Sequence, residues 1–204
     1  MAEFDRDFRR VVFASGNRGK LLEVNKLLAE FDVTVVPQSE FDIDAATEDG
    51  MSFVQNALIK ARHAAAMTGL PAIADDSGLA VDALDGRPGV HSARYAGEGA
   101  SEAQNIDKLL RDLKGIADER RGAVFYCAAV LVPLYGEALI AEGAWHGRIL
   151  TARLGAGGFG YDPVFLDTQL DLTAAQMTPQ EKNARSHRGQ AFRRLADMLR
   201  DRNP

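Results

Sequence analysis

Two adjacent carboxylates, Asp75 and Asp76, are the residues of this sequence best suited to chemistry. They follow the apolar run 71–74, which predicts a short buried strand, and precede Ser77-Gly78, a turn signal. We therefore expect both at the end of a strand, where open α/β sheets bind ligands. Because strand side chains alternate between faces, one carboxylate faces a given cleft and the other braces the turn. Taken alone, these residues are equally compatible with an ordinary solvated turn.

A small polar loop near the N-terminus predicts a phosphate-binding site. It follows a predicted strand at 11–14 and consists of Ser15, Gly16, Asn17, Arg18, Gly19 and Lys20. A helix follows, with apolar residues at three- and four-residue spacing: Leu21, Val24, Leu28 and Phe31. This order points backbone N–H groups and a positive helix end at a phosphate. The loop is not a P-loop, because Leu21 follows Lys20, and a plain strand-to-helix turn remains an alternative.

Two further stretches carry residues that suit a nucleotide. Residues 155–163 interleave glycines with Phe159 and Tyr161, which favours close backbone approach to a ligand and stacking on a base over a flexible linker. A basic cluster lies near the C-terminus: Lys182, Arg185, His187 and Arg188. A solvated basic turn is the alternative for this cluster.

The remaining pattern predicts the elements that position these residues. A capping-box pattern at Ser52 begins a helix that runs to about residue 67 and carries Lys60 and a surface His63. Other capped helices begin at Ser101 and Thr178, and a strand is expected at 33–37. Residues 123–132 and 138–141 predict an antiparallel hairpin. The apolar residues of the final helix are Phe192, Leu195, Met198 and Leu199. The pattern predicts an α/β fold with a mixed sheet and a second lobe.

Composition narrows the class of protein. The chain has 204 residues, of which 46% are hydrophobic, and a formal net charge of −5, which argues against a surface that attracts nucleic acid. No apolar run approaches the roughly 20 residues of a membrane helix, and the charged start does not match a secretory signal, so we expect a cytoplasmic protein. The single cysteine, Cys127, is expected to be a buried small hydrophobe.

Together these parts suit a nucleoside triphosphate. Mg²⁺ commonly binds one or two carboxylates plus substrate phosphates, and the candidate ligands are Asp76 and Glu48. A water held by the metal or by Asp76 would attack a phosphorus. The cations that would stabilise charge on the phosphate chain are Lys20, Lys60 and Lys182.

Six motifs resemble, in order, those of the inosine triphosphate pyrophosphatases, also described as dITP/XTP diphosphatases. They lie at residues 15–20, 56–62, 74–82, 88–95, 158–163 and 186–191, so that the resemblance covers nearly the whole chain. It implies hydrolysis of purine triphosphates with a 6-oxo base (dITP, ITP, XTP) to the monophosphate and pyrophosphate. It further implies Mg²⁺ as cofactor, a homodimer, and one domain, 1–204, with a mixed sheet, flanking helices and two lobes around a substrate cleft. Neither nucleic acid nor a membrane is implied as a partner.

The resemblance also implies roles for single residues. Ser15 to Lys20 would hold phosphates, Asp76 would be the catalytic carboxylate and a metal ligand, and Ser77 would contact substrate. Phe159, Gly160, Tyr161 and Asp162 would form the base pocket, and Lys182, His187 and Arg188 would bind phosphate and base. Many bacterial members have two consecutive glutamates where this chain has Glu48-Asp49, which weakens the metal assignment of Glu48.

Selectivity for a 6-oxo purine follows from hydrogen bonding. A fixed donor such as Arg188 facing the 6-position would reject an amino group, since an unpaired buried donor costs about 1–3 kcal/mol. Two alternatives remain: a pyrophosphatase for other modified nucleotides, and a nucleotide sensor that does not turn over substrate.

Overall fold

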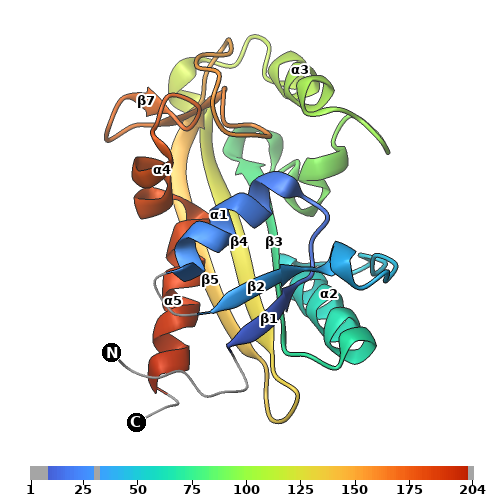
Figure 1. Cartoon of the computed structure of the whole chain (residues 1–204). Helices are drawn as coiled ribbons and strands as arrows, with labels where there is room; N and C mark the ends of the chain where they lie inside the picture. Colours follow the sequence, from blue (N-terminus) through green and yellow to red (C-terminus); the bar gives the residue numbers. More distant parts are fainter. Residues whose placement is uncertain (1–8, 30–32, 202–204) are drawn as a thin grey trace. The chain divides into compact units, whose positions relative to one another are not determined.

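The computed structural model describes residues 9–29 and 33–201 of the 204-residue chain (Figure 1). The strands are β1 (Arg10–Phe13), β2 (Thr34–Pro37), β3 (Ala72–Val81), β4 (Gly122–Val132), β5 (Leu139–Ile149), β6 (Phe165–Asp167) and β7 (Leu172–Thr173). The α-helices are α1 (Arg18–Leu28), α2 (Phe53–Thr68), α3 (Glu102–Asp112), α4 (Pro179–Arg185) and α5 (His187–Asp201). The expected Phe31 at the end of the first helix lies outside the described residues.

The strands form one mixed sheet in the order β2-β1-β3-β4-β5-β6-β7. β1 pairs in parallel with both β2 and β3, whereas β5 with β6 and β6 with β7 are antiparallel. Since β4 and β5 are neighbours joined only by residues 133–138, they form the predicted hairpin. The predicted α/β class with a mixed sheet and flanking helices is confirmed.

Strand β3 corrects the prediction for the two carboxylates. The expected strand end and turn at Ser77-Gly78 do not occur, because β3 continues through them to Val81. β3 lies between β1 and β4 in the sheet, and its first two residues, Ala72 and Ile73, pair with β1. Asp75 and Asp76 are therefore interior strand residues on opposite faces, and neither braces a turn.

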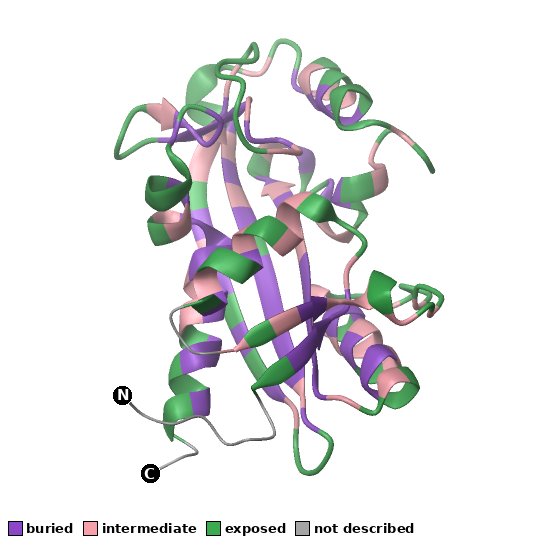
Figure 2. Cartoon of the chain, in the orientation of Figure 1, coloured by how far each residue is buried: buried purple, intermediate pink, exposed green. Residues whose placement is uncertain are grey.

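The chain divides into two compact units, the first comprising residues 1–76, 127–143 and 188–204. Its core has two layers, one on each face of the strands. Val11 and Phe13 of β1 pack with residues of α1 and α5, whereas Val12 and, just past the strand, Ala14 pack with α2. The long strands of the sheet are buried over much of their length (Figure 2). The buried residues that α2 contributes to the layer with Val12 are all alanines, Ala57, Ala61, Ala64 and Ala65, and larger, partly buried residues of the helix pack against them: Phe53, Val54 and Leu58. The small alanine side chains let the helix lie close to the strands.

The helix starts of the first unit follow local capping chemistry. Asn17 caps α1, its side chain accepting a hydrogen bond from the Lys20 N–H at 3.0 Å. Ser52 caps α2 by accepting from the Gln55 N–H. The predicted capping box is only half formed there, because Gln55 Oε1 accepts from the Met51 N–H instead, at 2.7 Å.

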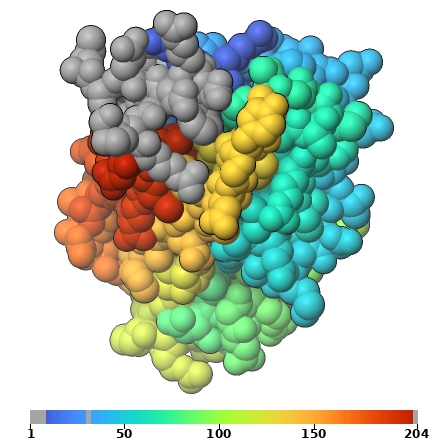
Figure 3. Space-filling view, turned by 90° about the horizontal axis from the view of Figure 1, so that it is seen from below, coloured from blue at the N-terminus to red at the C-terminus, as the bar shows by residue number. Residues whose placement is uncertain are grey.

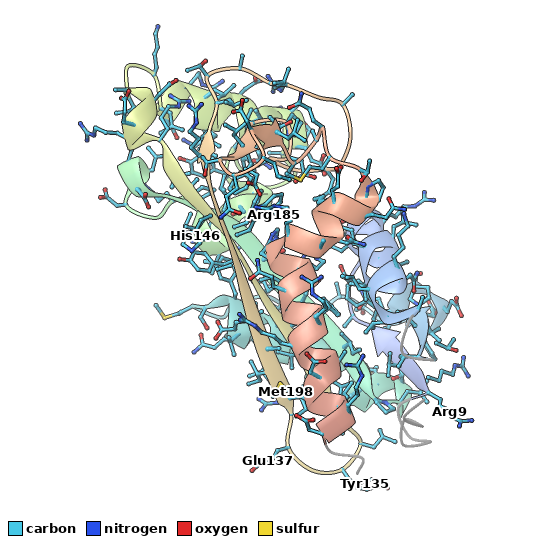
Figure 4. The ribbon with its side chains drawn as sticks, turned by 90° about the vertical axis from the view of Figure 1, so that its left-hand side faces the viewer. Arg9, Tyr135, Glu137, His146, Arg185 and Met198 are labelled. Atoms are coloured by element: carbon cyan, nitrogen blue, oxygen red, sulfur yellow. The ribbon has the colours of Figure 1, made fainter. Side chains whose placement is uncertain are left out.

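The hairpin and the last helix complete the first unit. Tyr135 and Glu137 lie at the hairpin tip (Figure 4), and the hairpin connection is at the surface in the space-filling view (Figure 3). Three of the four predicted apolar residues of α5 are buried: Phe192, Leu195 and Leu199. The prediction for Met198 is wrong, since its side chain is 37% exposed.

The second unit, residues 77–126 and 144–187, has its own core. Leu79 and Val81 from β3 pack there with Leu109 of α3 and with an aromatic group: Phe125, Trp145, Tyr161 and Phe165. Arg121 is buried and donates three hydrogen bonds to the carbonyls of Leu113, Ile149 and Leu150. The predicted capping boxes at Ser101 and Thr178 are both complete.

Two predictions from composition can be compared with the structure. Cys127 is buried, and burial raises the pKa of its thiol far above the ordinary value, as expected of a core residue. Among the described residues, no helix is long and apolar enough to cross a membrane.

Candidate active site

The first face of β3 carries Asp75 in a buried ionic network within the first unit. One carboxylate oxygen, Oδ2, lies 3.1 Å from Lys20 Nζ and accepts hydrogen bonds from Nε and Nη2 of Arg188, both at 3.1 Å. Arg188 Nη1 donates to Glu23 Oε2 at 2.6 Å. Burial by itself would raise the pKa of Asp75, but Lys20, Arg188 and Lys60 outweigh it and hold the pKa well below its usual range.

The opposite face of β3 presents Asp76 to α2, also within the first unit. Oδ1 accepts from Lys60 Nζ at 3.2 Å, and Oδ2 accepts from Asn56 Nδ2 at 3.2 Å. Lys60 Nζ also donates to Glu48 Oε2 at 3.0 Å, so that one ammonium joins two carboxylates. Burial raises the pKa of Asp76, and the charges of Lys60 and Lys20 offset this only in part. Asp76 is thus more basic than an ordinary aspartate.

This arrangement suits acid–base chemistry on a polyanion. A carboxylate of raised pKa accepts a proton more readily, and two lysines on either side of the strand supply positive charge. Lys60 itself lies near three carboxylates: burial would lower the pKa of Lys60, but Asp76, Asp75 and Glu48 raise it.

The donor set around Lys60 fits Mg²⁺ bound jointly with a substrate. The ammonium that joins Glu48 and Asp76 shows that the two carboxylates are arranged to share a cation. Among the described residues, no cluster of three or more His, Cys, Asp or Glu side chains could hold a metal by itself. Two carboxylates plus phosphate oxygens is a common way to bind Mg²⁺, whose ligands are oxygens.

Only residues 15–17 of the predicted phosphate loop precede α1; the helix begins at Arg18, earlier than predicted, and already contains Lys20. Asn17 N–H donates to Ser15 Oγ at 3.2 Å, and the Asn17 side chain caps the helix, which fixes the loop conformation. A Cβ atom added at Gly16 would meet nothing within 4 Å, so the backbone is open to a ligand there. Arg18 and Gly19 are the first two residues of α1.

The predicted base-pocket residues lie in the second unit. Asp162 Oδ2 accepts from the Phe159 N–H at 2.8 Å and from Lys182 Nζ at 2.6 Å. Lys182 Nζ also lies 4.6 Å from the centre of the Phe159 ring, in a cation–π contact. The structure therefore brings Phe159, Asp162 and Lys182 together, and their contact with a base stays a prediction.

Other predicted residues have structural partners of their own. The hydroxyl of Tyr161 donates to the Ser92 carbonyl at 2.8 Å, and its ring belongs to the core. Gly160 has φ +59, a left-handed conformation that favours glycine. His187 is buried and stacks on Phe125, with ring centres 4.7 Å apart. Ser77 is a half-buried residue of β3.

Three residues that complete the first-unit site were not predicted in the positions they hold. Asp75 was expected to brace a turn, Asn56 was only the first residue of the motif 56–62, and Glu23 was not singled out. Glu23 lies three residues after Lys20 on α1, a spacing that places both on one helix face and could have drawn attention to it. The role of Asn56 depends on a hydrogen bond to a residue twenty positions away, which no local pattern encodes.

The fold and these sites define an α/β protein with a buried charge cluster on strand β3, and comparisons identify its family. Residues 11–198 match the model of the Ham1 family. The dITP/XTP pyrophosphatase of Pectobacterium atrosepticum is 52% identical over 195 residues, covering 95% of this chain and 99% of that protein. That of Thioalkalivibrio sulfidiphilus is 51% identical, covering 95% and 100%. This chain belongs to the Ham1 family.

A solved structure agrees with this assignment. A HAM1 protein from Coxiella burnetii superposes with a TM-score of 0.85 at 46% identity, covering 94% of this chain and 98% of that one. The Staphylococcus aureus Ham1 protein gives a TM-score of 0.84 at 38% identity, covering 95% and 99%. The resemblance predicted from six motifs is confirmed at the level of the family.

Proposed function

We propose that this protein hydrolyses non-standard purine nucleoside triphosphates (dITP, ITP and XTP) to the nucleoside monophosphate and pyrophosphate. The observation that carries the proposal is the Asp76 carboxylate, which has a raised pKa and lies between Lys60 and Asn56 on the strand that also carries the Asp75–Lys20 pair. Relatives about 50% identical over nearly the whole chain are dITP/XTP pyrophosphatases, which supports this choice of substrate.

In the proposed reaction a water oxygen bonds to the α-phosphorus and the bond from that phosphorus to the bridging oxygen of the β-phosphate breaks. The attacking water loses a proton to the Asp76 carboxylate, which Lys60 and Asn56 hold in place through hydrogen bonds. Pyrophosphate leaves with the bridging oxygen and its electron pair. The products are the monophosphate and pyrophosphate, as hydrolysis requires.

The negative charge of the triphosphate is the main obstacle to attack by water, and basic residues of the protein offset it. Lys60 contacts Asp76, and Lys20 contacts Asp75 on the same strand. Both ammonium groups are held by helices, Lys20 by α1 and Lys60 by α2. Ser15 to Lys20 would supply backbone N–H groups at the start of α1. We propose Asp76 and Glu48 as the Mg²⁺ ligands; bound Mg²⁺ supplies further neutralisation of phosphate charge.

The remaining assignments rest on the family resemblance. For the purine base we propose Phe159 to Asp162, with Lys182 and His187, and we propose Ser77 as a substrate contact. Arg188 is proposed as a base-binding donor, although its Nε, Nη1 and Nη2 donate to Asp75 and Glu23 in this structure. A homodimer, a cytoplasmic location and the absence of nucleic-acid or membrane partners belong to the same proposal.

Product analysis tests the proposed function. The protein is incubated with Mg²⁺ and dITP, XTP, ITP, dGTP or dATP, and pyrophosphate and orthophosphate are measured separately. Pyrophosphate formed mainly from dITP, XTP and ITP is the expected result. Orthophosphate would place the attack at the terminal phosphorus, and preferred turnover of another modified nucleotide would change the substrate class. Binding of dITP without turnover would favour a sensor.

A further inference from the structure

Asn56 joins the catalytic strand to a loop that carries a candidate metal ligand. It lies in the first turns of α2 and is only 2% exposed. Its side-chain oxygen, Oδ1, accepts a hydrogen bond from the Gly50 N–H at 2.8 Å. Its amide nitrogen, Nδ2, donates to Asp76 Oδ2 at 3.2 Å. Both ends of one amide are therefore used, one on each segment.

Lys60 repeats this double contact one helical turn later. Its ammonium donates to Asp76 Oδ1 and to Glu48 Oε2. Each oxygen of Asp76 is thus held by a different residue of α2, and each of those residues also holds the 48–50 segment. Because residues four apart share one face of a helix, α2 fixes the separation between the two segments.

The 48–50 segment lies so close to Asn56 that only glycine fits at position 50 without a shift. A Cβ atom added to Gly50 would lie 2.6 Å from Asn56 Oδ1 and 2.8 Å from the Gln55 Cβ. The amide cannot be reversed either, since that would set its NH₂ group against the Gly50 N–H and its oxygen against the Asp76 carboxylate. Position 56 therefore requires an acceptor and a donor on one short planar group.

We propose that Asn56 is a positioning residue for the metal-dependent reaction: it sets the placement of Glu48 relative to Asp76. The inference rests on the proposed function for its catalytic consequence, but not for its structural one. A merely structural role would lower stability and leave the response to Mg²⁺ unchanged. If Asn56 positions the two carboxylates, its loss should weaken their joint binding of Mg²⁺. Loss of an outer-shell partner of a metal site typically costs 10–100-fold in metal affinity or activity.

The test compares Asn56→Ala with a matched control, Gln55→Ala. Gln55 is the adjacent helix residue and also accepts a hydrogen bond from the same loop, at the Met51 N–H. Within the described residues, the hydrogen bonds to the Asp76 carboxylate come from Asn56 and Lys60 and not from Gln55. For Asn56→Ala we expect the Mg²⁺ concentration at half-maximal dITP turnover to rise about 10-fold or more. For Gln55→Ala we expect less than a twofold change. Thermal unfolding checks that both variants are folded.

Two readouts do not depend on turnover. Hydrogen exchange of the Gly50 amide should accelerate at least about 10-fold in Asn56→Ala and stay unchanged in Gln55→Ala, because only the first variant removes its acceptor. Calorimetric titration with Mg²⁺ alone should show weaker binding in Asn56→Ala than in Gln55→Ala. If the wild-type protein released no pyrophosphate from dITP, the proposed function would fail while these two measurements still tested the positioning role.

Gly50→Ala provides a second variant that leaves Asn56 and Asp76 in place. Its added methyl group pushes on the same contact from the loop side, so it should reproduce the raised Mg²⁺ requirement. It also keeps the test decisive should Asn56→Ala fail to fold. Equal Mg²⁺ responses in Asn56→Ala and Gln55→Ala, or a normal Mg²⁺ response in Gly50→Ala, would overturn the inference.

Discussion

Asp75 and Asp76 are chemically identical neighbours on one strand, yet the two faces of β3 give them opposite properties. The Asp75 side chain is fully buried and has two cations on one oxygen, and its pKa is held well below the ordinary value. The Asp76 side chain is 12% exposed, and its pKa is raised. The number of cations in contact, more than burial itself, decides in which direction each pKa moves.

This difference separates a structural role from a reactive one. A carboxylate with a strongly lowered pKa is a poor base, but it anchors Lys20 and Arg188 from two different helices. A carboxylate with a raised pKa is a better base, and its partners Lys60 and Asn56 come from one helix. We therefore expect substitutions of Asp75 to affect folding first and substitutions of Asp76 to affect turnover first.

Asp75→Ala should produce the largest change in the free energy of unfolding. It leaves Lys20 and Arg188 without their shared buried carboxylate, and removing one partner of a buried ion pair costs about 3–5 kcal/mol. Denaturant unfolding of the Mg²⁺-free protein measures the loss. Asp76→Asn is the control and should change the free energy of unfolding by less than about 1 kcal/mol. Equal losses in the two variants would remove the distinction between the faces of β3.

Asp76→Asn should produce the largest change in turnover. An amide of the same shape keeps only one of the two hydrogen bonds from α2, because its NH₂ group cannot accept from Asn56 or Lys60. It also cannot accept the proton of water, so we expect a fall of roughly 100-fold or more in pyrophosphate release from dITP. Circular dichroism and thermal unfolding should match the wild-type protein. Near-normal turnover would show that Asp76 is not the catalytic carboxylate.

Glu48→Gln tests the second candidate ligand on the Asp76 face, with a smaller expected effect. Glu48 shares Lys60 with Asp76, so its loss should raise the Mg²⁺ concentration at half-maximal turnover about 10-fold. The adjacent exposed carboxylate provides the control, and Asp49→Asn should change this value less than twofold. A reversed order would move the metal ligand from Glu48 to Asp49.

Much of this site could be predicted from sequence because its motifs are local. Lys20 follows a strand and a Gly-containing loop, and Lys60 lies on a helix with a recognisable start. The helix that carries Lys60 was predicted close to its observed bounds, whereas α1 begins at Arg18, inside the predicted loop. Asp76 was identified from its neighbours in the chain and from the family motif. The mixed sheet followed from one predicted hairpin added to alternating strands and helices.

The long-range contacts could not be predicted in the same way. The pattern Asp-Asp-Ser-Gly predicts a turn, because these residues are favoured in turns when nothing else pairs with them. In the folded protein Arg188, more than a hundred residues away, neutralises Asp75 and lets the strand continue. Here tertiary contacts override the local preference for a turn. The hydrogen bond between Asn56 and Asp76 is likewise a contact between distant residues that no local pattern predicts.

The two carboxylates should also respond to pH with opposite signs, and this is the smallest effect we expect. The pKa of Asp75 is lowered in the folded state, so its stabilising contribution is present above its unfolded value of about 4 and is lost as pH falls through the folded pKa. The pKa of Asp76 is raised, so its contribution is present below about 4 and is lost as pH rises through the folded pKa.

Unfolding free energies measured in EDTA between pH 3 and 7 distinguish these signs, since each proton contributes a slope of at most about 1.4 kcal/mol per pH unit. The wild-type advantage over Asp75→Asn should shrink as the pH falls below about 4. The difference in unfolding free energy between the wild-type protein and Asp76→Asn should instead shift in favour of the wild type as the pH falls through the folded pKa of Asp76, because protonation relieves the cost of burying that charge. Parallel curves for the two variants would mean that the faces of β3 do not differ in the way their contacts indicate.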